Sequence, residues 1–94
     1  MDPDVQPVQL CVQAIRRYLD DHPDAADSLR GVVDWWVPSQ AERMSPAVVL
    51  AALQRLIESG EIEGRRVLGN RLMAADELRV DQTLDDPVIF SRRR

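Results

Sequence analysis

The residues best suited to chemistry are three arginines, Arg65, Arg66 and Arg71, grouped in one short segment. A guanidinium presents several N–H donors to phosphate oxygens, so this group could contact a nucleic-acid backbone or enter a minor groove. Each arginine on a phosphate would release about one counterion, so three of them predict weak and strongly salt-dependent binding. The alternative is that they are solvated charges that keep an edge hairpin from aggregating.

Residues for catalysis are sparse. His22, the only histidine, precedes Pro23 at a break between helical patterns, which is more typical of a turn or cap than of an acid–base or metal site. Cys11 is the only cysteine and lies on an apolar helix face, which indicates a small core residue rather than a reactive thiol. The chain lacks a phosphate loop, a dinucleotide fingerprint and a nucleophile elbow. We therefore expect no enzyme activity, no cofactor and no metal site.

The length and net charge of the chain limit the classes of protein to which it can belong. The 94 residues fit one domain, and 45% of them are hydrophobic, enough for a modest core. The net charge of −4 argues against a dedicated nucleic-acid binder, although a local basic patch can still touch phosphate. No apolar run reaches membrane-spanning length, and the N-terminus does not resemble a signal peptide. We expect a cytoplasmic protein with no membrane partner, and we infer no small-molecule ligand.

Two helices precede the central region. After a loose segment 1–6, apolar residues recur at helical spacing from Pro7 to about Asp21. A second helix is predicted from an Asp24 N-cap to the residue before Pro38, with Trp36 on its buried face. Gly31 lies inside this helix, and we expect another backbone to pass close to it.

A third helix and a hairpin follow. Ser45 is a predicted N-cap with Pro46 in the first turn, and Ser59-Gly60 is a predicted stop. Two short strands are predicted around Gly69-Asn70, in a register that the pattern leaves open. The segment 76–94 is predicted to be a tail, acidic at first and then apolar and basic. The domain itself is predicted over 7–75.

The segment 7–75 resembles the winged helix-turn-helix superfamily. The resemblance lies in the Ser45-Pro46 start, the run "LAALQRLIESGEIE" and the arginine-bearing hairpin up to Met73. It implies an α+β fold, mostly α, with a three-helix core followed by a two-stranded hairpin wing and a C-terminal tail. It also implies that the third helix is a recognition helix. The linker 37–44 departs from the pattern, because it is longer than the usual tight turn between the second and third helices.

Sorting the third helix by face changes what the resemblance predicts. A base-reading helix presents polar or basic side chains in its N-terminal half. Here that half presents Ala47, Val48 and Ala51, whereas Gln54 and Arg55 lie farther along. Sequence-specific reading by this helix is therefore not favoured. The candidates for DNA or phosphate contact are Gln54, Arg55, Arg65, Arg66 and Arg71.

Several apolar residues are predicted to point outward. Adjacent tryptophans on a helix point about 100° apart, so Trp35 cannot share a core with Trp36. The outward set, a candidate surface for protein binding, consists of Leu10, Trp35, Ala47, Val48 and Ala51. The alternative is that the connector 37–44 or the run 87–90 folds back over these residues.

These observations give two hypotheses. The first is a small non-enzymatic module that binds a protein partner or a second copy of itself, through the outward apolar set. The second is a DNA-binding transcriptional regulator that uses the third helix and the arginine-bearing wing.

Overall fold

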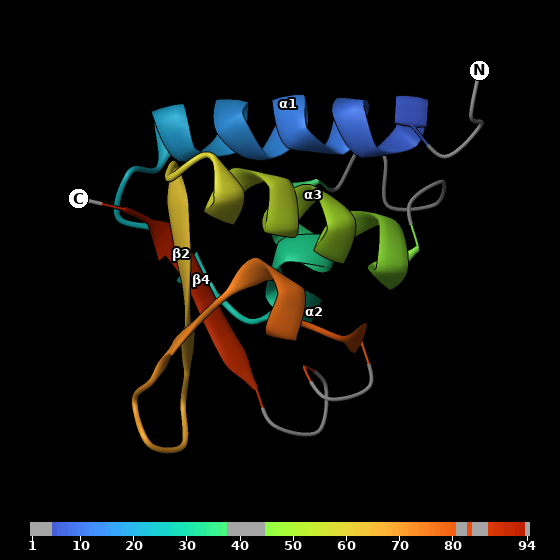
Figure 1. The fold of residues 1–94 in the computed structure, drawn as a ribbon. Coiled ribbons are helices and arrows are strands. Elements are labelled where there is room, and N and C mark those ends of the chain that lie inside the picture. The colour runs from blue at the N-terminus through green and yellow to red at the C-terminus, as the bar shows by residue number, and fades with distance from the viewer. Residues whose placement is uncertain (1–4, 38–44, 81–82, 84–86, 94) are drawn as a thin grey trace.

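The computed structural model describes residues 5–37, 45–80, 83 and 87–93 and has an α+β fold (Figure 1). The chain runs through α1 (Val5–Asp21), β1 (Ala26–Asp27), α2 (Leu29–Gly31), the π-helix η1 (Val32–Trp36), α3 (Pro46–Glu58), β2 (Ile62–Arg66), β3 (Leu72–Met73), the 3-10 helix η3 (Ala75–Glu77) and β4 (Val88–Arg92). The predicted α+β class is confirmed. The loose segment 1–6 and the connector 37–44 fall largely outside the described residues.

The sheet is larger than the predicted two-stranded hairpin. Four described strands pair antiparallel in the order β1-β4-β2-β3. The strand β4 lies within the segment 76–94, so residues 88–92 of the part expected to be a tail belong to the sheet. The reason is its pairing: Glu63 to Arg66 of β2 face Ser91 to Val88 of β4. Such a pairing between distant segments leaves no local signal in the sequence.

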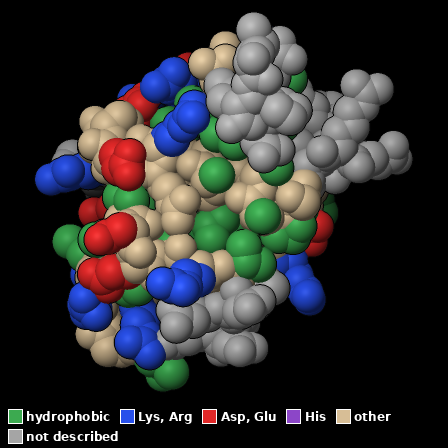
Figure 2. Space-filling model, turned by 45° about the vertical axis from the view of Figure 1, so that its right-hand side comes forward, with side chains coloured by type: hydrophobic (Ala, Val, Ile, Leu, Met, Phe, Trp, Pro, Cys, Tyr) green, Lys and Arg blue, Asp and Glu red, His purple; other side chains and the backbone are tan. Residues whose placement is uncertain are grey.

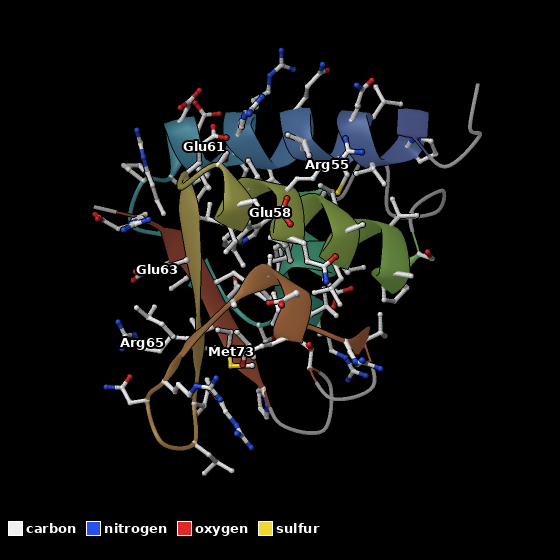
Figure 3. All side chains as sticks on the ribbon, viewed as in Figure 1. Arg55, Glu58, Glu61, Glu63, Arg65 and Met73 are labelled. Atoms are coloured by element: carbon white, nitrogen blue, oxygen red, sulfur yellow. The ribbon has the colours of Figure 1, made fainter. Side chains whose placement is uncertain are left out.

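Helices cover one face of the sheet (Figure 1). Alternation along the strands turns Ile62, Val88 and Phe90 inward, where they are buried. They meet the apolar stripes of α1 and α3, which pack on each other, and the buried face of the second helical segment. Glu63 and Arg65 lie on the opposite side of β2, away from α3 (Figure 3). The core is therefore a single layer between helices and sheet.

The second helical segment differs from its prediction. Its N-cap is Ser28, whose hydroxyl accepts a hydrogen bond from the Gly31 N–H at 3.3 Å, and Asp24 lies outside the helix. Asp27 belongs to β1 and accepts a 3.0 Å hydrogen bond from the indole N–H of Trp36. The helix continues as the π-helix η1, a form that often marks functional sites. Within it Trp36 is buried, as predicted, and Trp35 is exposed.

Gly31 is required by a side chain and not by a passing backbone. Its φ of −64° is ordinary helical geometry, so conformational freedom is not the reason for glycine here. A Cβ at this position would lie 2.5 Å from Oδ1 of Asp27 and 2.9 Å from its Cβ. The Asp27 side chain fills the space beside Gly31 because it reaches across to Trp36. The predicted close approach is therefore real, but its source is Asp27.

The third helix begins and ends as predicted. The Ser45 hydroxyl accepts a hydrogen bond from the Val48 N–H at 3.3 Å, and Pro46 occupies the first turn. Gly60 follows the helix with a φ of 81°, the left-handed geometry that favours glycine at this position. Arg16 of α1 then holds the start of β2, because its guanidinium donates two hydrogen bonds of 2.8 Å to the Glu61 carboxylate.

Candidate functional site: exposed apolar surfaces on the wing and the second helix

The outward face of α3 is only partly exposed. Ala47 is exposed, whereas Val48 and Ala51 are half-buried and pack against the core. Figure 2 shows hydrophobic side chains in the middle of one face of the molecule, with charged side chains along its edge. Of the three residues predicted to point outward from this helix, only Ala47 is therefore a free surface residue.

The segment after β3 covers the C-terminal half of this helix. The side-chain amide of Gln54 donates a 2.9 Å hydrogen bond to the carbonyl of Leu78. The 3-10 helix η3 packs against α3, and Ala75 and Leu78 are buried. The sequence suggests two other segments, 37–44 and 87–90, that could fold over the outward residues. The run 87–90 lies in and beside β4, and the connector 37–44 lies outside the described residues except for Val37.

The predicted DNA contacts are not brought together. Gln54 is engaged with Leu78, and Arg55 is exposed on α3 beside α1. Figure 3 shows Arg55 near α1 and Arg65 toward the far end of β2. The structure thus separates the basic residue of the helix from those of the wing, and it offers no continuous basic stripe between these two labelled side chains.

The arginines of the hairpin formed by β2 and β3, which we call the wing, contact residues of the hairpin and of η3. The Arg71 guanidinium donates hydrogen bonds of 2.9 and 2.7 Å to the two carboxylate oxygens of Glu77. Arg65 donates a 3.1 Å hydrogen bond to the carbonyl of Asn70, and Arg66 is half-buried. The pair with Glu77 neutralises the charge of Arg71, which reduces what this residue can give to a phosphate.

The turn of the wing carries apolar side chains at its tip. Gly69 and Asn70 both have positive φ, at 82° and 52°, and they form the predicted turn. The strands pair Arg65 with Leu72, so the loop is longer than a two-residue turn. Val67, Leu68 and Leu72 are consequently left outside the core, with 54%, 68% and 52% of their surface exposed. We call these three residues the wing tip.

The wing tip was not predicted as a binding surface. In the sequence, Val67 and Leu68 come directly before the turn residues Gly69-Asn70, and Leu72 follows shortly after them. All three apolar residues therefore lie near a turn. The sequence left the register open, and a two-residue turn would have placed Val67 opposite Leu72 within the ladder, so the exposure of these residues did not follow from the pattern.

Trp35 and Leu10, the two other residues predicted to anchor a partner, are exposed on different helices. Trp35 is 68% exposed on η1. Leu10 lies on α1 and lines a shallow hollow of about 350 Å³ with Gln13, Ala14, Arg17 and Tyr18, floored by Trp36. Trp35 does not line this hollow, so the structure does not join the two residues in one site.

The two residues considered for catalysis, Cys11 and His22, lie in the core and beside Tyr18, respectively. Cys11 is fully buried, as predicted, and burial raises the pKa of its thiol to about 12. His22 is exposed, with its ring centroid 4.5 Å from that of Tyr18. Among the described residues, no three His, Cys, Asp or Glu side chains gather to hold a metal ion. None of the described helices is long and apolar enough to cross a membrane.

Comparison of the chain with family models, with curated proteins and with solved structures gives no match. The candidate surfaces therefore rest on the geometry described above.

Proposed function

We propose that the chain is a small, non-enzymatic binding module of the winged-helix type that engages proteins through exposed apolar side chains. The order of elements supports this scaffold. Three helical segments precede the hairpin of β2 and β3, and the wing loop projects away from the helices (Figure 1). Farther along the chain, β4 pairs with β2 in the same sheet.

One observation carries the proposal. The hydrogen bond from Gln54 to Leu78, together with the burial of Ala75 and Leu78, places a piece of the same chain against α3. A helix that reads bases presents polar side chains to the major groove, whereas here Gln54 is engaged by the same chain. Among the described residues, the large apolar side chains that stay exposed lie elsewhere, at the wing tip, at Trp35 and at Leu10. Apolar and aromatic anchors of this kind are typical of protein interfaces.

Site-specific photocrosslinking in cells tests the proposal. A benzoylphenylalanine in place of Trp35 or Leu68 should give discrete crosslinked protein bands. The same residue in place of Glu58, an exposed polar site on α3, serves as the control. Crosslinks from positions 35 or 68 but not from 58 are expected. Equal crosslinking from all three positions, or none from 35 and 68, would contradict an apolar binding surface.

A second candidate function is DNA contact by the wing, favoured by the arginines that flank the tip. The alternative predicts weak binding to duplexes of any sequence, since phosphate contacts carry no sequence information. Fluorescence anisotropy of a labelled duplex should then fall steeply as salt rises. It should also be lost in the Arg65→Ala/Arg66→Ala/Arg71→Ala variant. Binding that survives this triple change would exclude the wing as the DNA contact.

A further inference from the structure

The wing tip is an apolar surface held in one conformation. The Arg66 N–H donates to the Arg71 carbonyl at 2.7 Å, and the Val67 N–H donates to the Pro87 carbonyl at 3.0 Å. The ion pair of Arg71 with Glu77 ties the returning strand to η3. Because these contacts fix the loop before any partner arrives, docking costs little additional ordering of the backbone.

The charge around the wing tip is opposite to that of the rest of the chain. The segment 65–72 contains three arginines and no acidic residue, and one of the three, Arg71, is paired with Glu77 of η3. Since the whole chain has a net charge of −4, removing these three positive charges leaves −7 on the remaining residues. A polyanionic partner such as DNA or an acidic membrane would be repelled by most of the molecule while attracted to the tip. A second copy carries the same net charge of −4, so its attraction to the tip comes only from a local contact between the basic tip and an acidic neighbourhood.

The chain also presents a matching surface. Among the described residues outside the wing, Trp35 is the most exposed large apolar side chain, and it follows Asp34, which is exposed as well. A tryptophan face accepts both aliphatic side chains and guanidinium groups, and a neighbouring carboxylate pairs with arginine. The η1 surface therefore offers an apolar anchor with an acidic neighbour, which complements an apolar tip with basic neighbours.

We infer that the wing tip docks on a second copy of this chain, with Leu68 against Trp35 and Arg65 beside Asp34 of the other copy. This inference rests on the proposed function and names its partner. The contact joins two different surfaces of one chain, so each copy can supply either side of it. Each contact is small, and the association is expected to be weak, with a dissociation constant in the range of about 10 μM to 1 mM.

The test is the mass of the purified full chain by sedimentation velocity over a concentration series that spans this range. The mass of the natural chain should rise above that of a monomer. Leu68→Asp should stay monomeric, because it places a charge in the apolar contact. Leu10→Asp is the matched control: Leu10 is also half-exposed, but it lies outside the contact, so this variant should associate like the natural chain. Circular dichroism checks that each variant folds, and Leu68→Ser replaces any that does not.

Charge reversal tests the pairing itself. Arg65→Glu and Asp34→Arg should each weaken association by at least about tenfold, because each brings like charges together. The Arg65→Glu/Asp34→Arg double variant should associate again, since the pair is restored in reverse. Three results would overturn the inference: a natural chain that stays monomeric throughout, a Leu68→Asp variant that associates normally, or a double variant that is not rescued. A monomeric chain that still crosslinks to another protein from position 35 or 68 would leave the proposed function standing.

Discussion

The side-chain amide of Gln54 donates a 2.9 Å hydrogen bond to the main-chain carbonyl of Leu78, and so joins α3 to the segment that follows the wing. The helix that the sequence suggests as a DNA reader therefore has its polar side chain turned toward its own chain. Leu78 is buried at this contact, with 4% of its surface exposed. The segment that follows the wing therefore covers part of α3.

This relationship predicts that Leu78 contributes to folding as a core residue. Leu78→Ala should lower the free energy of unfolding by about 2–4 kcal/mol, the usual cost of removing a buried leucine side chain. Leu72→Ala is the matched control, because Leu72 lies on the same excursion but is half-exposed. It should cost less than about 1 kcal/mol. Urea unfolding of the two variants measures both values, and equal costs would show that Leu78 is not packed on α3.

Replacing the buried Trp36 should likewise cost more folding free energy than replacing the exposed Trp35. Trp36→Phe removes the hydrogen bond to Asp27 and leaves that carboxylate without its indole donor, so it should cost about 1–3 kcal/mol. Trp35→Phe should change the unfolding free energy by no more than about 0.5 kcal/mol. Acrylamide should quench the fluorescence of the Trp36→Phe variant, which keeps Trp35, far more than that of the Trp35→Phe variant. Equal quenching would mean that Trp35 is not the exposed member.

Gly31→Ala offers a test of local packing against helix propensity. Alanine is favoured over glycine inside a helix by about 1 kcal/mol, so propensity alone predicts stabilisation. The added Cβ would lie 2.5 Å from Oδ1 of Asp27, and the Asp27 side chain would have to leave Trp36. We expect a net loss of about 1–3 kcal/mol. A thermal melt that shows higher stability would contradict the position of Asp27.

The ion pair between α1 and the start of β2 predicts a dependence on pH. Hydrogen bonds from Arg16 and then from Ser59 hold the pKa of Glu61 below its ordinary value of 4.5. A carboxylate with a lowered pKa stabilises the fold at pH values above 4.5, and this contribution is lost as the pH falls through its value in the folded state. Both side chains are well exposed, so the pair should contribute no more than about 1 kcal/mol.

Comparison of the natural chain with Glu61→Gln over a pH series measures this contribution. The variant should be less stable near neutral pH, and the difference should shrink well below pH 4.5. A difference that stays constant across the series would mean that the charge of Glu61 is not involved.

The local features of the fold could be predicted from the sequence. The start of α3 at Ser45 and Pro46, its end at Gly60 and the turn at Gly69-Asn70 depend on residues close together in the chain. Each has a stereochemical preference that a short stretch displays. The burial of Cys11 and Trp36 followed from helical spacing for the same reason.

The predictions that were wrong concern contacts between residues that are far apart in the sequence. The pairing of β4 with β2 joins segments separated by the whole wing, and the pairing of β1 with β4 involves only two residues of β1. The N-cap of α2 was placed at Asp24 because Asp27 then suited the first turn, whereas Asp27 in fact reaches Trp36 from β1. The outward set changed because Val48 and Ala51 are half-buried and pack against the core, which depends on how α3 sits in the whole fold.

The central claim is that α3 is not the reading surface of this protein. Titration of the ¹⁵N-labelled chain with a mixed-sequence duplex, at low salt of about 20 mM where phosphate contacts are strongest, tests it most directly. We predict that amide shifts in the NMR spectrum, where they occur, are confined to the wing segment 65–72 and disappear as salt rises. Shifts of the amides from Ala47 to Arg55, persisting at physiological salt, would contradict the account, because they would show that α3 enters a groove.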